Sequence, residues 1–123
     1  MSFTTVSAAT LAAGPGPHPA ASAYDKGVGE ALGVSAFGLY QVELPAGAVT
    51  VEHDHIEDRA EDVYAVLRGR GAVLVDGHEV LIGPGQFVAV TPESTRFVRA
   101  GADGLTFFAV CAAARGGDPV TAR

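Results

Sequence analysis

Short apolar runs, each closed by a turn signal, fill the chain from residue 34 onward. Runs of Val, Leu, Phe, Tyr and Ile recur about every 8 to 12 residues, and clusters of Gly, Pro and Asp separate them. This spacing is typical of antiparallel β structure and needs no helix of three turns. The pattern predicts about eight strands, at residues 34–44, 48–53, 62–67, 72–75, 78–82, 86–90, 95–99 and 105–112.

The dipeptide Asp76-Gly77 lies between two of these runs. Because both residue types tolerate a positive φ, it predicts a two-residue type I′ hairpin turn. Short antiparallel strands in a core of about 90 residues suit an all-β jelly-roll barrel, which hides most of its edges and can enclose a ligand cavity.

The first 33 residues have a different character, since they are rich in Ala, Gly and Pro. The run at residues 14–19 can neither continue a helix nor fill the hydrogen bonds of a strand ladder. We therefore expect an irregular N-terminal arm at residues 1–33, a barrel at residues 34–115 and a flexible tail at residues 116–123.

Composition and charge exclude several classes of partner. The chain has 8 Lys and Arg against 14 Asp and Glu, a net charge of −6, and no basic run that could follow a phosphate backbone. No stretch approaches the ~18 apolar residues of a membrane span. The first 13 residues lack the basic start and apolar block of a signal peptide. We expect a cytoplasmic protein that binds neither nucleic acid nor membrane.

Two histidines, His53 and His55, stand two residues apart on a segment that should be extended. The side-chain period of a strand is 2, so both rings should lie on the same side, with Cα atoms roughly 6.5–7 Å apart, and could share one ion. Their neighbours include four acidic residues, at positions 52, 54, 57 and 58. The same spacing therefore also fits a solvated loop. We interpret His18 and His78 as surface residues and Cys111 as a small core residue.

The surrounding sequence resembles the two motifs of the cupins over roughly residues 34–112. Gly47, five residues, His53-Asp54-His55, and then Asp62 followed by six residues and Gly69, resemble the first motif. The segment from Gly85 through Pro92 to Arg96 resembles the second. The resemblance implies a double-stranded β-helix whose interior holds a metal ion on three histidines and a glutamate. Because cupins are commonly homodimers, the arm could lie across a sheet edge of a second copy.

The chain departs from that ligand set at two positions. The glutamate position falls on Asp62, and the six residues between His55 and Asp62 would also let Glu61 or Glu57 supply the carboxylate. Arg96 stands at the place of the third histidine, and a guanidinium has no lone pair to donate to a cation. The candidate ligands are therefore His53, His55 and a carboxylate from Asp62 or Glu61, for a divalent ion that can be Fe, Mn, Zn or Ni.

Two functional hypotheses follow. In the first, the metal ion, Arg96 and Tyr64 bind a small anionic molecule, with an oxygenase, isomerase or cyclase type of activity. In the second, Arg96 pairs with Asp62 or Glu61 in the space of the ion, and the protein is a metal-free binding or sensor protein. A purely structural site, with the same charge pairing and no open cavity, is a third alternative.

Overall fold

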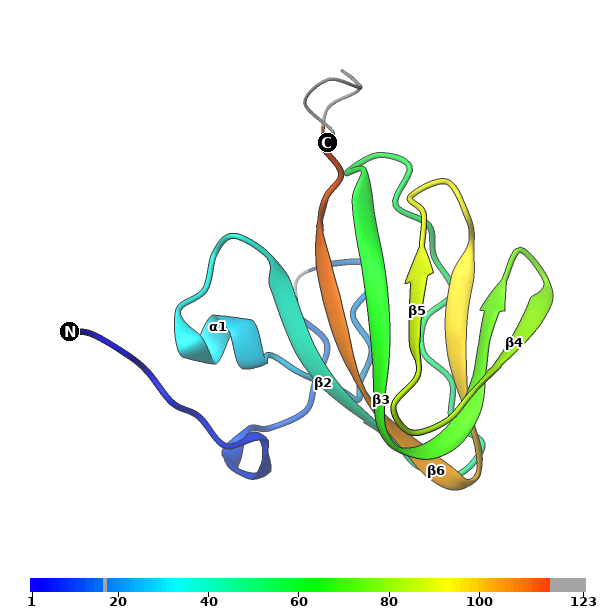
Figure 1. The fold of residues 1–123 in the computed structure, drawn as a ribbon, viewed down its shortest axis with the longest axis horizontal. Coiled ribbons are helices and arrows are strands. Elements are labelled where there is room, and N and C mark those ends of the chain that lie inside the picture. Colours follow the sequence, from blue (N-terminus) through cyan, green and yellow to red (C-terminus); the bar gives the residue numbers. More distant parts are fainter. Residues whose placement is uncertain (17, 116–123) are drawn as a thin grey trace.

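The structure is a computed structural model that describes residues 1–16 and 18–115, and it consists mainly of one antiparallel sheet (Figure 1). Within the described residues, the strand order is β1-β2-β6-β3-β4, and β5 pairs with β3. The strands are β1 (Asp25–Lys26), β2 (Gly38–Leu44), β3 (Ala60–Val75), β4 (His78–Ile82), β5 (Phe87–Val90) and β6 (Arg96–Ala113). A short helix α1 (Val28–Leu32) and a 3-10 turn η1 (Ala8–Thr10) precede β2. The described part contains no helix with the length and apolar character that crossing a membrane requires.

The prediction of an all-β fold is confirmed, and so is the hairpin at Asp76-Gly77. Val75 pairs with His78, and the two turn residues have φ of 50° and 83°. The predicted tail at residues 116–123 lies outside the described residues.

Several predicted strand boundaries are wrong. Residues 62–67 and 72–75 belong to the single strand β3, and residues 95–99 and 105–112 belong to the single strand β6. Shifts in the β3–β6 register lie between Val66 and Arg68 and between Gly69 and Gly71. Such irregularities bend a strand without ending it, so the glycines that predicted turns mark bends instead. Residues 48–53 form only two isolated bridges, Val49 with Arg99 and His53 with Arg96.

The core lies inside the curved sheet and follows the alternation of the strands. In the first half of β3, Ala60, Asp62, Tyr64 and Val66 are buried, while Glu61 between them is exposed. Phe107 of β6 is 1% exposed, and its ring meets the ring of Tyr64 edge to face at a centroid distance of 5.6 Å. Because Asp62 shares its parity with these core residues, its carboxylate is directed into the barrel.

Part of the N-terminal arm belongs to the sheet of its own chain. Asp25 pairs with Val42 and Lys26 with Gln41, so β1 covers the edge of β2. The Lys26 ammonium also contacts Glu43 at 3.2 Å and the carbonyl of Ala8 at 3.0 Å. The first residues extend away from the barrel, and none of residues 1–13 is buried (Figure 1). The homodimer stays a prediction that this arrangement does not test.

Two glycines in the left-handed region give a stability test of the bend in β3. Gly69 and Gly85 both have φ of 81°, which costs an alanine roughly 1–2 kcal/mol. At Gly69 a methyl group would also overlap the backbone carbonyl of Gly104, whereas around Gly85 there is open space. Overpacking adds roughly 1–3 kcal/mol. In urea denaturation, Gly69→Ala should therefore lose clearly more unfolding free energy than Gly85→Ala; equal losses would contradict the close approach.

Candidate functional site

A cavity of about 140 Å³ lies inside the barrel and is partly open to solvent. Its wall comes from β2, β3 and β6, from the segment between β2 and β3 that contains His53 and His55, and from residues of the N-terminal arm. The apolar part of the wall contains Tyr40, Val42, Val98, Phe107, Ala109 and Cys111. The polar part contains His18, Asp25, Thr50, His53, His55, Asp58, Asp62 and Tyr64. The cavity thus suits a small molecule that is largely apolar and has one polar end.

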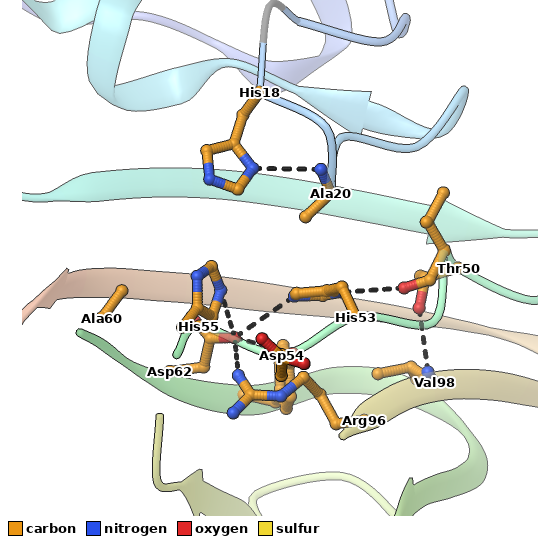
Figure 2. Close-up of polar contacts among 12 residues, drawn as sticks. His18, Ala20, Thr50, His53, Asp54, His55, Ala60, Asp62, Arg96 and Val98 are labelled. Atoms are coloured by element: carbon orange, nitrogen blue, oxygen red, sulfur yellow. Dashed lines mark hydrogen bonds and ion pairs between the residues drawn. The ribbon is translucent and has the colours of Figure 1, made fainter. Parts of the chain in front are cut away.

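Backbone hydrogen bonds hold the two-histidine segment against the start of β6. The amide of His53 donates to the carbonyl of Arg96 at 3.0 Å, and the amide of Arg96 donates back at 2.8 Å. The amide of His55 donates to the carbonyl of Pro92 at 2.9 Å. Both rings are directed to the same interior region, as the strand spacing predicted, with centroids 4.8 Å apart (Figure 2).

The Asp62 carboxylate lies next to both rings. Its Oδ2 is 3.3 Å from Nε2 of His55 and 3.7 Å from Nε2 of His53. The possible ligand atoms of these three residues all lie within 4.8 Å of one another. The sequence left the choice of carboxylate open, and the structure brings Asp62 into the group. Glu61 is exposed because it precedes Asp62 on a strand whose side chains alternate, and Glu57 is exposed on the loop before β3.

The hydrogen bond at Nδ1 of each ring fixes the tautomer of that histidine. Nδ1 of His53 is 2.8 Å from the carbonyl oxygen of Val51, and Nδ1 of His55 is 2.9 Å from Oδ1 of Asp58. A carbonyl and a carboxylate only accept hydrogen bonds, so the acceptors assign the proton of each neutral ring to Nδ1. Both Nε2 atoms then carry lone pairs that face Asp62.

Arg96 is fully buried and does not line the cavity. Its Nη1 donates to Oδ2 of Asp62, its Nη2 donates to the carbonyl of Thr91, and its Nε donates to the carbonyl of Ser94 at 3.1 Å. Figure 2 shows the guanidinium beside Asp62, on the side away from His18. We expected Arg96 to face the ligand; instead, each of its three guanidinium nitrogens donates a hydrogen bond to one of these three oxygens. The pairing with Asp62 is the one that the metal-free hypothesis describes.

Burial and neighbouring charges set the protonation of this group. Burial acts to raise the pKa of Asp62, but the charge of Arg96 and the hydrogen bond from the Tyr64 hydroxyl act to lower it, and this pKa lies below its usual value. Burial, followed by the charge of Asp62, raises the pKa of Tyr64. Tyr64 therefore stays protonated, and its hydroxyl donates to Oδ2 of Asp62 at 3.1 Å.

The sequence interpretation missed two residues of the cavity wall, His18 and Asp58. Nε2 of His18 is 3.2 Å from Oδ2 of Asp58, and the rings of His18 and His55 have centroids 5.6 Å apart. The position of Asp58 three residues after His55 was a weak signal. Nothing in the sequence relates His18 to a residue 40 positions later. His78 is exposed, as we expected.

Carboxylates dominate the charge of the cavity wall. Asp25, Asp58 and Asp62 line it, and no Lys or Arg of residues 1–16 and 18–115 does so. The protein without a bound cation therefore offers an anion little attraction.

Neither a protein-family model nor a curated protein matches this chain. Solved structures share its fold. A cupin protein from Bacteroides fragilis superposes with a TM-score of 0.74 at 22% identity, over 98% of this chain and 94% of that one.

Two other solved structures resemble the barrel. A sugar phosphate isomerase of the cupin superfamily from Silicibacter pomeroyi has a TM-score of 0.65 at 24% identity, over 73% of this chain and 59% of that one. A predicted oxalate decarboxylase from Thermotoga maritima has a TM-score of 0.64 at 21% identity, over 73% of this chain and 79% of that one. At these identities the likeness is one of fold, and it agrees with the motifs around His53 and Arg96. The protein is therefore a small jelly-roll protein with the cupin fold.

Proposed function

We propose that this protein binds a divalent metal ion through His53, His55 and Asp62 and uses it to hold a small anionic molecule in the cavity. One observation carries the proposal: the Nε2 atoms of His55 and His53 face Oδ2 of the same buried carboxylate, at 3.3 and 3.7 Å. Lone pairs and a carboxylate repel one another unless positive charge lies between them, and a metal ion would supply that charge. Two histidines and one carboxylate form a common facial set for such ions.

The donor atoms fit several ions and leave room for a ligand. Two imidazole nitrogens and one carboxylate suit Fe, Mn, Zn and Ni without distinguishing them. A bound ion would polarise a ligand oxygen as a Lewis acid. Tyr64 lines the cavity next to Asp62 and is the candidate substrate contact. Apolar cavities of about 150 Å³ hold one benzene molecule, so the space here suits a ligand of similar size.

The reaction type is proposed only as a class. Two neighbours in structure are named for a sugar phosphate and for oxalate, both of which are anions. An isomerase, oxygenase or cyclase activity on a small anionic molecule agrees with an open metal position beside a proton-bearing Tyr64. In that activity, the chain's own residues would orient the ligand, while the apolar wall would limit access of water.

The ion pair of Asp62 with Arg96 favours a second candidate. Arg96 already supplies a positive charge to Asp62, so the site can persist without metal and bind a small molecule directly. Because Asp25 and Asp58 also line the cavity, such a ligand should be neutral or cationic. The same ion pair should weaken metal binding in the first candidate, since the ion and the guanidinium would share one carboxylate.

Metal titration of histidine variants tests the first candidate. His53→Ala and His55→Ala should each weaken Co²⁺ or Zn²⁺ binding by more than about 100-fold, because even losing a hydrogen-bond partner of a ligand costs about 10- to 100-fold. His78→Ala, which removes an exposed histidine, should bind like the wild type. Calorimetry with each purified protein measures these affinities. Wild-type protein that binds none of Fe²⁺, Mn²⁺, Zn²⁺ and Ni²⁺ would exclude the metal site and leave the metal-free candidate.

A further inference from the structure

The arm contributes a histidine whose two ring nitrogens are both engaged. Nδ1 of His18 accepts a hydrogen bond from the amide of Ala20 at 3.0 Å, and the amide of Ala21 donates to the carbonyl of His18 at 3.0 Å. These bonds form a turn at residues 18–21. An Nδ1 that accepts has no proton, so Nε2 of the neutral ring carries it and donates to Oδ2 of Asp58 at 3.2 Å. Figure 2 shows His18 reaching from the arm toward the other two rings.

Asp58 connects that turn with the interior of the site. Its Oδ1 accepts from Nδ1 of His55 at 2.9 Å and from the amide of Ala60 at 3.3 Å, and its Oδ2 faces both His55 and His18. The side chain of Asp58 is 46% exposed, whereas that of His55 is only 7% exposed. The half-exposed carboxylate of Asp58 thus accepts a hydrogen bond from Nδ1 of the buried His55 ring, and it accepts another from Nε2 of His18.

His18, His55 and Asp58 have ligand atoms within 4.8 Å of one another, but they do not suit a second metal ion. The lone pair of His18 accepts from Ala20, and Nδ1 of His55 carries a proton. Neither nitrogen that faces Asp58 therefore has an electron pair for a cation. The group is better described as a chain of hydrogen bonds that ends at Nε2 of His55.

We propose that Asp58 and His18 are positioning residues for His55. Asp58 fixes the Nδ1–H tautomer and the ring orientation, so that Nε2 presents its lone pair to the cavity, and His18 keeps Asp58 turned toward the ring. An exposed pair of this kind adds little to folding stability, so its role is local to the site. Ala20 and Ala21, next to His18, line the same cavity. The contact of His18 with Asp58 therefore also connects the cavity wall formed by the arm with His55. The effect on metal affinity rests on the proposed function; the effect on the tautomer does not.

The tautomer is measured on metal-free protein by ¹H–¹⁵N NMR of the imidazole nitrogens at about pH 9, where histidine is neutral. Wild-type His55 should show the Nδ1–H form. Asp58→Ala should convert most of the His55 population to the Nε2–H form, and Glu57→Gln, which changes the exposed neighbouring carboxylate, should not. If His55 has the Nδ1–H form in both the wild type and Asp58→Ala, the proposal is overturned, whether or not the protein binds a metal ion.

The role of His18 is tested by metal affinity in a double-mutant cycle. Asp58→Ala should weaken Zn²⁺ binding by about 10- to 100-fold, and His18→Ala should weaken it less. In the Asp58→Ala background, His18→Ala should have no further effect, because His18 acts through Asp58. His18→Gln should restore near wild-type affinity, since its amide also donates to Asp58. Additive losses, or equal losses for His18→Gln and His18→Ala, would overturn the assignment of His18. If wild-type protein binds no Zn²⁺, the cycle is measured with whichever of Fe²⁺, Mn²⁺ and Ni²⁺ it binds. If it binds none of these ions, the proposed function fails, and the same cycle is then decided on the tautomer of His55.

Discussion

Replacing Arg96 with methionine should lower the unfolding free energy of the metal-free protein by about 3–5 kcal/mol, because the change leaves one buried charge without its partner. Asp62 is 5% exposed, and Arg96 is a partner with a permanent positive charge. The carbonyls of Thr91 and Ser94 would lose their donors as well. Urea denaturation monitored by circular dichroism measures the loss.

Two controls separate the buried ion pair from a general effect of removing arginine. Arg99→Met removes an arginine that pairs with Glu79 at the surface, and it should cost less than about 1 kcal/mol. Asp62→Asn combined with Arg96→Met removes both charges and should cost less than Arg96→Met alone. If the double variant is no more stable than Arg96→Met, the charge of Asp62 is not what Arg96 compensates.

The Arg96→Met variant also tests whether Asp62 takes part in binding the metal ion. With Arg96 absent, a divalent ion would become the main positive partner of Asp62, so Zn²⁺ should stabilise Arg96→Met by more than it stabilises the wild type. Equal stabilisation of the two proteins would show that Asp62 does not take part in binding the ion.

Local patterns in the sequence were sufficient for much of the fold. The short apolar runs closed by turn signals predicted the all-β class, and Asp76-Gly77 predicted its hairpin. Local patterns were not sufficient at Gly69 and Gly71, which resemble a turn. There the neighbouring strand β6 bends together with β3, so pairing continues past both glycines. Whether a glycine ends a strand or bends it depends on its partner strand. For Gly69 and Gly71 the partners are Leu105 and Ala100, 36 and 29 residues later in the chain.

The sequence predicted the part of the candidate site that depends only on the spacing of residues along a strand. His53 and His55 share a side because they are two residues apart, but the choice between Glu61 and Asp62 needs the phase of β3, which the sequence leaves uncertain by one residue. The position of Arg96 predicted that it points inward, and it does. Its guanidinium contacts Asp62 and does not reach the cavity, because the carbonyls of Thr91 and Ser94 accept hydrogen bonds from its other two nitrogens. The contact of His18 with Asp58 joins two irregular segments, for which no periodicity exists.

A small carboxylate should bind in the cavity only when the metal ion is present. Without the ion, the three lining carboxylates outnumber the one buried guanidinium, so acetate should bind weakly. A bound divalent ion would balance that charge and offer a coordination position to the carboxylate. Two opposite unit charges 4 Å apart attract by about 4 kcal/mol near a protein surface, part of which desolvation offsets. Zn²⁺ should therefore raise acetate affinity by about 100-fold or more, which is about 2.7 kcal/mol, as measured by NMR titration.

Acetamide provides the matched control for charge, because it has nearly the shape of acetate and is neutral. Its affinity should change by less than about tenfold on addition of Zn²⁺, since it lacks the charge that the ion attracts. Two leucine variants locate the binding site: Ala109→Leu places a larger side chain in the cavity wall, and Ala112→Leu places the same side chain on an exposed part of β6. Only the variant at Ala109 should weaken acetate binding. Acetate affinity that is the same with and without Zn²⁺, in a protein that binds Zn²⁺, would separate the metal site from the ligand cavity and favour the neutral or cationic ligand of the metal-free candidate.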